Sequence, residues 1–216
     1  FPTRRSSDLV PVGVMEVIGA HLPRVLILGH SFVWRFEDFC AESGRYDLNL
    51  SQCQVAYESV SGGSADNIIQ QSILASDSIV RQYRPHIVVV QSGGNELCDL
   101  TLTPWDVSCG LSGMVNLLIK DFGVEKVVVC EIFSRPRPRY ISSIQYACRR
   151  DLANMYVQGI IESTVGARFW EHRFPPAVAP FASDGVHLNE PGQECFYRSI
   201  RGAIQKALSP NAIKFD

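Results

Sequence analysis

"RVLILGHSFVWRF" (residues 24–36) passes from an apolar run into a segment with helical spacing, and Gly29, His30 and Ser31 form the junction. A strand that turns into a helix in this way is typical of a parallel α/β sheet, where ligands bind beyond the carboxyl ends of the strands. A serine hydroxyl at this turn is exposed, and its amide lies near a helix N-terminus, which favours negative charge. Ser31 is therefore a candidate nucleophile. Serine is also a preferred helix N-cap, and this stretch alone leaves both interpretations open.

Short apolar runs recur along the chain, and each is followed by a longer helical segment. The runs cover 24–30, 48–57, 86–93, 126–133 and 167–172, and the helices are expected at 32–43, 65–83, 104–121, 141–164 and 190–208. Runs that are apolar on both alternations suit parallel strands that are covered on both faces. We therefore predict a doubly wound, five-stranded parallel sheet in a flavodoxin-like three-layer α/β/α sandwich. Ser31, Ser64 and Asn189 are plausible N-caps for three of the helices.

Composition excludes several classes of protein. The 216 residues are 46% hydrophobic and carry a formal net charge of -2, which fits one compact domain without a broad basic field for nucleic acid. No apolar run approaches the length of a membrane span. The seven cysteines are scattered and include no Cys-x-x-Cys pair, so we expect reduced and mostly buried thiols.

The first nine residues, "FPTRRSSDL", resemble the translation of a sequencing adapter, and we predict that 1–9 are a non-native leader ahead of a domain at 24–208. They lack the apolar core of a signal peptide, which favours the cytoplasm, although a non-native leader would leave the compartment open.

Three further segments place polar groups where strands end. "ESVSGGSADN" follows the second run and brings Gly62, "SGGNEL" follows the third and brings Asn95, and "SDGVHLNEPGQ" sets Asp184 three residues before His187. A glycine lets a backbone amide approach a ligand, and an Asn side chain can donate to an oxyanion, although either residue also suits a plain turn. A carboxylate that accepts from His Nδ1–H leaves Nε2 free to take a serine proton.

Together these four segments resemble the SGNH (GDSL-like) hydrolase family, whose signature blocks carry Ser, Gly, Asn and His in this order. The resemblance covers about residues 24–208. It implies that Ser31, Asp184 and His187 are the catalytic triad, and that the Ser31 amide, the Gly62 amide and the Asn95 side chain form the oxyanion hole. It also implies a reaction without a cofactor.

Two residues depart from the family pattern. His30 stands where the family usually has Asp, which helps to hold the oxyanion loop, so this change bears on loop organisation and rate more than on reaction type. We expect His30 to be structural, and one hypothesis is that it replaces the Asp by hydrogen-bonding the same loop. Glu96 replaces a more frequent Asp and keeps its charge.

Several other side chains suit structural roles. Arg135, Arg137 and Arg139 alternate with prolines after the fourth run, and we interpret them as a solvated loop that could also attract an anionic substrate group. Trp34 and Trp105 could line an acyl or sugar site, since aromatic side chains are common in small-ligand pockets, but we favour a place in the core for both. His21, His86 and His172 have no partners at metal-ligand spacing, so we predict no metal site.

The sequence thus predicts a serine hydrolase that cleaves a short acyl or acetyl ester of a carbohydrate or other small molecule. One alternative is a catalytically weak or silent SGNH-like binding domain, as in accessory modules of mobile-element proteins. A second is a flavodoxin-like phosphate or nucleotide-binding domain with "SGGSADN" as the anion loop, although this leaves "SDGVH" without a role.

Overall fold

Five parallel strands form one sheet in the order β2-β1-β3-β4-β5. The structure is a computed structural model that describes residues 22–209, so the predicted leader and His21 lie outside the described residues. The strands are β1 (Arg24–Gly29), β2 (Gln54–Ser59), β3 (Ile87–Gln91), β4 (Lys126–Cys130) and β5 (Ala167–Trp170). We predicted a doubly wound sheet without a strand order, and the observed order is doubly wound, with its topological switch between β1 and β3.

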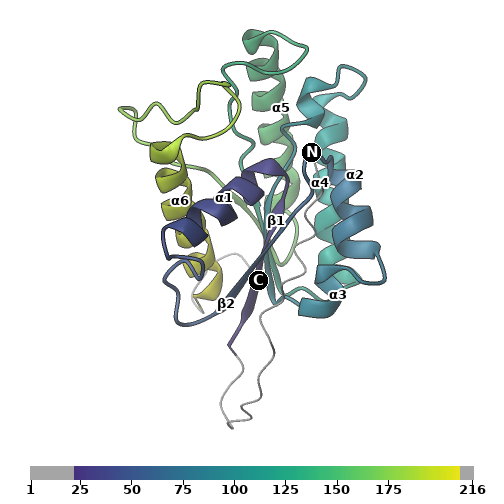
Figure 1. The fold of residues 1–216 in the computed structure, drawn as a ribbon. Helices are drawn as coiled ribbons and strands as arrows, with labels where there is room; N and C mark the ends of the chain where they lie inside the picture. Colours follow the sequence, from purple (N-terminus) through teal and green to yellow (C-terminus); the bar gives the residue numbers. More distant parts are fainter. Residues whose placement is uncertain (1–21, 210–216) are drawn as a thin grey trace.

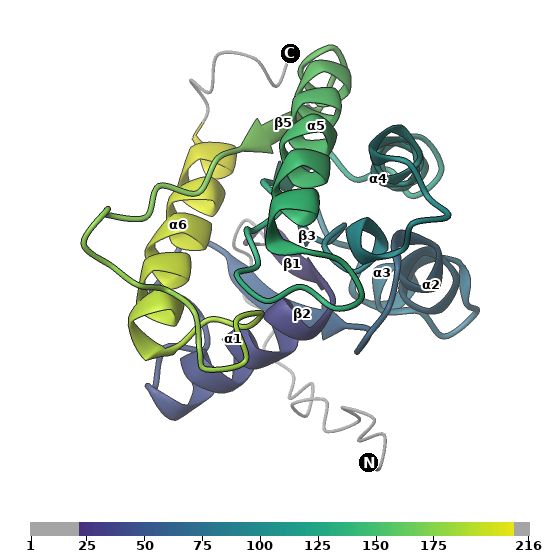
Figure 2. The same ribbon diagram turned by 90° about the horizontal axis from the view of Figure 1, so that it is seen from above.

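Helices cover both faces of the sheet (Figure 1). One layer consists of α1 (Ser31–Glu42) and α6 (Glu190–Leu208). The other contains α2 (Ala65–Ile68), the π-helix η1 (Ile69–Leu74), α3 (Ile79–Tyr83), α4 (Pro104–Lys120) and α5 (Ser143–Glu162), with the short 3₁₀ helix η2 (Glu96–Cys98) after β3. Seen from above, the sheet lies between the two helical layers (Figure 2). Three layers are therefore present, as predicted.

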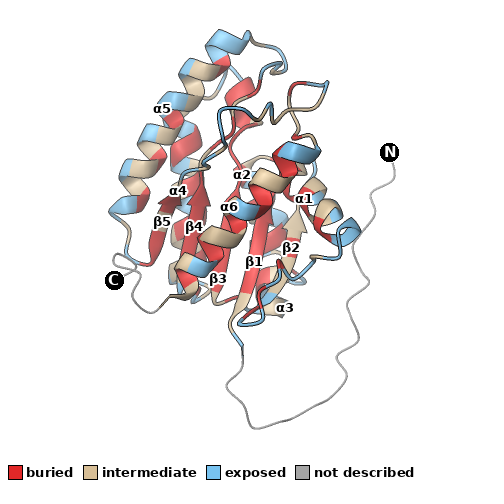
Figure 3. Ribbon diagram, turned by 90° about the vertical axis from the view of Figure 1, so that its left-hand side faces the viewer, coloured by how far each residue is buried: buried red, intermediate tan, exposed pale blue. Residues whose placement is uncertain are grey.

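The two cores lie on opposite faces of the same strands. Along β1, Val25 and Ile27 pack against α1 and α6, whereas Leu26 and Leu28 pack against the other layer. All four side chains are fully buried, and Figure 3 shows the central strands buried along their length. This explains why the runs are apolar on both alternations.

The second strand begins later than we predicted. The expected strand at 48–57 is found at 54–59, because Leu48 and Asn49 adopt positive φ angles of 56° and 51°. Both Leu48 and Leu50 are buried, so their side chains anchor a turn and do not contribute to a strand. The Leu48 carbonyl accepts hydrogen bonds from Tyr197 and Arg201 of α6.

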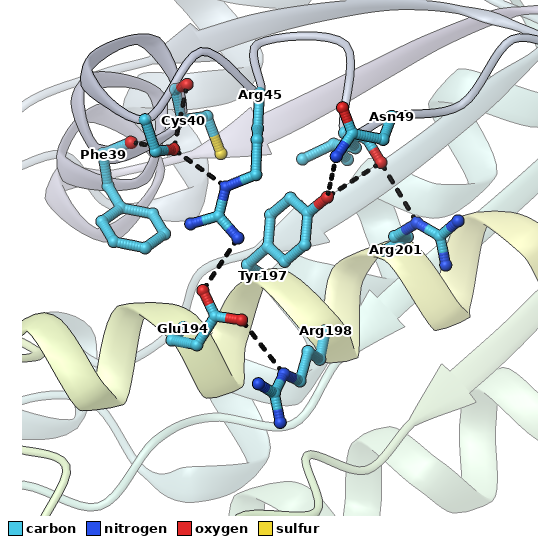
Figure 4. Close-up of polar contacts among 10 residues, drawn as sticks. Phe39, Cys40, Arg45, Asn49, Glu194, Tyr197, Arg198 and Arg201 are labelled. Atoms are coloured by element: carbon cyan, nitrogen blue, oxygen red, sulfur yellow. Dashed lines mark hydrogen bonds and ion pairs between the residues drawn. The ribbon is translucent and has the colours of Figure 1, made fainter.

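An arginine ties the same region to α6 (Figure 4). Arg45 donates to Glu194 at 2.9 Å and lies over the Tyr197 ring, with its guanidinium carbon 4.2 Å from the ring centroid. Asn49 donates to the Tyr197 hydroxyl. The end of α1 and the start of β2 are thereby held against the last helix, whose N-terminal end carries the His187 segment.

The helix predicted at 65–83 is interrupted. After η1 the chain leaves helical geometry at Ala75, and Ser78 caps a new helix by accepting from the Arg81 amide. The Ser78 hydroxyl also donates to the Ile73 carbonyl at 2.8 Å, which closes the break. The other four helices lie within two residues of the predicted ends.

The expectations of free cysteines and of no membrane span can be compared with the described residues. All seven cysteines are free, and Cys40, Cys53, Cys98 and Cys130 are buried. Within residues 22–209, no helix is both long and apolar enough to cross a bilayer.

Candidate active site

Ser31 is the first residue of α1, directly beyond the carboxyl end of β1. Its Oγ lies 3.1 Å from Nε2 of His187, which is 156 residues further along the chain. The N-cap is His30 and not Ser31, so the capping interpretation of Ser31 is wrong. As the first helical residue, Ser31 has an amide without an intrahelical acceptor, so this N–H is available at the N-terminus of α1.

His187 is oriented by Asp184. Nδ1 of His187 and Oδ2 of Asp184 are 2.7 Å apart, and Oδ1 of Asp184 accepts from the backbone amides of Val186 and His187, both at 2.9 Å. Gly185 permits this tight turn with a φ angle of 65°. Ser31, His187 and Asp184 therefore form a continuous hydrogen-bonded line.

The N-terminus of α6 holds this turn in place. Asn189 is the N-cap, as predicted, and its Oδ1 accepts from the Gly192 amide at 2.9 Å. Its Nδ2 donates to the carbonyl of Ala179 at 2.7 Å. Gly192 lacks a side chain because a Cβ would lie 2.1 Å from the Pro180 carbonyl oxygen. The loop before His187 is thus packed directly on the helix that follows it.

The electrostatics keep the histidine neutral and the aspartate ionised. Burial lowers the pKa of His187, the hydrogen bond to Asp184 raises it, and the positive charge of Arg35 lowers it further, with the pKa below 6.5 as the net result. For Asp184, desolvation raises the pKa, but hydrogen bonds from His187 and from two backbone amides outweigh it and bring the pKa to about 2. A neutral imidazole beside a carboxylate is the protonation state that a general base requires.

The predicted oxyanion donors lie on neighbouring loops that are bonded to each other. Gly62 follows β2 with a φ angle of 67°, which an L side chain rarely adopts. Asn95 follows β3, and its Nδ2 donates to the Gly63 carbonyl at 3.0 Å. Oε1 of Glu96 accepts from the Ala65 amide at 2.6 Å. The Gly62 loop is therefore fastened by both Asn95 and Glu96, a role of Glu96 that the sequence did not predict.

These same bonds argue against a phosphate loop. Ser64 caps α2 as predicted, and its backbone amide donates to the side chain of Asn67. The Asn67 amide in turn donates to the Ser64 hydroxyl, and the Ala65 amide donates to the Glu96 carboxylate. A helix N-terminus with its amides engaged and a carboxylate against it does not provide the free donors that a phosphate needs.

Comparison with known proteins finds solved structures with a similar fold but no similar sequence. No protein-family model matches the sequence, and no curated protein matches it. Among solved structures, a GDSL-like lipase from Bacteroides thetaiotaomicron is similar, with a TM-score of 0.66, 18% identity and coverage of 86% of this chain and 89% of that one. The lipase/acylhydrolase of Enterococcus faecalis has a TM-score of 0.60 and 16% identity, with 88% and 99% covered. A family 3 carbohydrate esterase from Talaromyces cellulolyticus has a TM-score of 0.59 and 17% identity, with 86% and 97% covered.

The chain has the SGNH hydrolase fold.

Against the SGNH pattern, His30 does not replace the usual Asp as we hypothesised. Its side chain is buried, and within residues 22–209 its Nδ1 has no hydrogen-bond partner, so it does not tie down the oxyanion loop. Burial, followed by the charges of Arg135 and His187, lowers the pKa of His30 to about 3. The ring packs against Phe32, with 5.5 Å between centroids. A neutral, packed His30 fills space beside the site.

The three arginines of the SGNH-like chain do not act as one solvated loop. Arg137 and Arg139 are exposed as predicted, and Arg137 donates to the Ser183 carbonyl next to Asp184. Arg135 is only 5% exposed, and its guanidinium donates to Oδ1 of Asn95 at 2.9 Å. The prediction of a solvated side chain is wrong for Arg135, because the fold turns it inward toward Asn95.

The two tryptophans expected in the core lie at the surface. Trp34 is 48% exposed and Trp105 is 51% exposed, so the prediction is wrong for both. Trp34 follows Ser31 by one helical turn and lies next to Arg35.

His86 and His172 are engaged in structural hydrogen bonds. His86 accepts from the Arg24 amide, and His172 is hydrogen-bonded through its two ring nitrogens to Ser199 and Gln91. Within residues 22–209, no three His, Cys, Asp or Glu side chains gather as metal ligands would.

Proposed function

We propose that this chain is a serine esterase that cleaves short acyl or acetyl esters of a carbohydrate or other small molecule through an acyl-enzyme. The observation that carries the proposal is the hydrogen-bonded line from Ser31 through His187 to Asp184, with distances of 3.1 and 2.7 Å. This arrangement, on an SGNH fold, favours an enzyme over a silent binding domain, because a binding role does not require a serine, a neutral histidine and an ionised aspartate in line.

In the proposed mechanism Ser31 Oγ attacks the ester carbonyl carbon, and His187 Nε2 takes the serine proton. Asp184 stabilises the imidazolium that forms. The carbonyl oxygen becomes an oxyanion that accepts from the Ser31 amide, the Gly62 amide and Asn95 Nδ2. The intermediate collapses with proton transfer from His187 to the leaving alcohol, which leaves the acyl group on Ser31. Water, deprotonated by His187, then attacks the acyl-enzyme and releases the acid and free Ser31.

The names of the similar structures guide the choice of substrates. They include a GDSL-like lipase, a lipase/acylhydrolase and a carbohydrate esterase. We therefore expect the purified chain to hydrolyse aryl acetate and to release acetate from acetylated sugars, with both activities absent from Ser31→Ala. A folded wild-type protein that binds acetylated sugars but releases no acetate would support the silent binding domain in place of the esterase.

The lowered pKa of His187 predicts the pH profile. Because Nε2 must be unprotonated to accept the serine proton, kcat/KM should rise with pH through a pKa below about 6.5 and then level off.

Since the positive charge of Arg35 contributes to the lowered pKa of His187, Arg35→Gln should move the acidic limb of the profile to higher pH. Rates measured from about pH 4 to about pH 8 would check both points. Arg198→Gln, which removes an exposed charge on α6, is the control. An acidic limb above about 6.5 in the wild type would contradict the electrostatic account.

Arg137 and Arg139 remain candidates for attracting an anionic substrate, since both are exposed. Replacing both by Gln should weaken kcat/KM for acidic esters several-fold, about as much as added salt does, and should leave neutral esters unchanged. The comparison uses a neutral and a carboxylate-bearing ester of the same acyl group. Equal losses for the two esters would assign these arginines to the scaffold, through the bond from Arg137 to Ser183.

A further inference from the structure

Arg135 is the buried arginine nearest to the proposed oxyanion donors. It lies in the loop after β4, yet its side chain reaches the loop after β3, where Nη2 donates to Asn95 Oδ1 at 2.9 Å and Nη1 contacts Cys98 Sγ at 3.7 Å. Its guanidinium carbon lies 5.7 Å from the Tyr146 ring centroid and 5.9 Å from that of Phe32. The guanidinium is thus held between the rings of Phe32 and Tyr146 and by its hydrogen bond to Asn95.

The residue before Asn95 makes room for this contact. A Cβ on Gly94 would lie 2.8 Å from Nη2 of Arg135 and 3.2 Å from its guanidinium carbon. Tyr146 is itself held, since its hydroxyl donates to the Phe133 carbonyl at 3.0 Å. The second glycine of "SGGNE" therefore lets the arginine come up against the Asn95 side chain.

The charge of Arg135 is not neutralised by an ion pair. Within residues 22–209, no carboxylate lies at ion-pair distance from it, and its Nε is buried without a partner. The carboxylate of Glu96 is close in sequence to Asn95, but its Oε1 accepts from the Ala65 amide. Burial raises the pKa of the Glu96 carboxyl and the positive charge of Arg135 lowers it, so the two groups interact without a direct ion pair. A buried cation that is not held in a direct ion pair is unfavourable in the resting protein. The same positive charge becomes favourable when negative charge develops nearby, as it does on an oxyanion.

The bond from Arg135 also decides which way the Asn95 amide faces. Because the guanidinium has only N–H donors, Oδ1 must face it, and Nδ2 must face the opposite side. One Nδ2–H donates to the Gly63 carbonyl, and the second remains for another acceptor. A charged donor on Oδ1 polarises the amide and strengthens the donors on Nδ2.

We propose that Arg135 is a positioning residue of the oxyanion hole, which orients and polarises the Asn95 amide so that Nδ2–H donates to the developing oxyanion. This inference rests on the proposed esterase function. It gives Arg135 a role that does not involve contact with the substrate, in contrast to the exposed Arg137 and Arg139.

The test is a double-mutant cycle between Arg135 and Asn95. Arg135→Met keeps an unbranched apolar side chain but removes the guanidinium with its donors and charge. It should lower kcat on a neutral aryl ester about 10-fold or more with little change in KM, a smaller loss than removal of the donor itself. In the Asn95→Ala background the same substitution should cause almost no further loss, because the group through which it acts is already absent. Arg135→Lys, which restores a charged donor, should recover part of kcat.

Thermal unfolding of every variant, with Arg198→Met on α6 as the surface control, separates positioning from loss of fold. If Arg135→Met does not fold, the cycle is run with Arg135→Lys. A loss of kcat that is equally large in the wild-type and Asn95→Ala backgrounds would overturn the proposal, as would a loss confined to KM for acidic esters. A wild-type protein without Ser31-dependent hydrolysis would remove the proposed function and this proposal together.

Discussion

Ser31→Ala and His187→Ala are each expected to lower the turnover of a short-chain aryl ester by several orders of magnitude, up to about 10⁶-fold. The reason is the direct contact between Ser31 Oγ and His187 Nε2, through which one group activates the other. Since the two act as a unit, the double variant should be no slower than either single one. Initial rates at saturating ester are the measurement.

A serine and a histidine away from the candidate site provide matched controls. Ser43→Ala removes a serine at the other end of α1, where its hydroxyl donates to the Phe39 carbonyl. His86→Ala removes a histidine that accepts from the Arg24 amide at the amino end of β3. Both controls should keep wild-type turnover if they fold. A single triad variant that retained more than about a tenth of wild-type turnover would show that the nucleophile or the base is misassigned.

Asn95→Ala is expected to lower turnover by about 10² to 10³, or about 2.7–4 kcal/mol, because it removes one donor to the oxyanion. It also removes the acceptor of the buried Arg135, so stability should fall by about 1–3 kcal/mol. Asn95→Asp separates the two effects, since it keeps an oxygen toward Arg135 and loses the Nδ2 donor. We expect the Asp variant to be as slow as the Ala variant in kinetics. In denaturant unfolding its stability should lie between those of the Ala variant and the wild type, because it keeps the bond with Arg135 but loses the bond from Nδ2 to the Gly63 carbonyl. Normal turnover in a folded Asn95→Ala protein would exclude this residue from the oxyanion hole.

The sheet could be predicted because burial on both faces leaves a strong local signal. Val25 to Leu28 alternate between the two cores, and a short run that is apolar on both alternations is typical of a strand covered by helices on both sides. The signal fails where apolar side chains anchor a turn. Leu48 and Leu50 are as buried as strand residues, but positive φ angles at 48 and 49 turn the chain toward α6.

The residues of the candidate site could be predicted from their positions relative to the strands and helices. Each of them follows the carboxyl end of a strand or precedes a helix, and parallel topology brings these positions to one edge. The roles of Arg135 and Glu96 were not predictable. An arginine in a stretch that alternates Arg and Pro is typical of a solvated loop, and only the contact with Asn95, 40 residues away, identifies Arg135 as buried. Glu96 accepts from the backbone amide of Ala65, and a backbone donor cannot be recognised from the residue type in the sequence.

Labelling with a fluorophosphonate probe tests the central claim most directly, because such a probe bonds to a serine only when a neighbouring base activates it. The account predicts one adduct per folded wild-type chain, located on the peptide that contains Ser31 by mass spectrometry. It also predicts no adduct on Ser31→Ala and a greatly slowed reaction on His187→Ala. Labelling of Ser31→Ala at the wild-type rate, or no labelling of a folded wild-type chain, would contradict the assignment of Ser31 as an activated nucleophile.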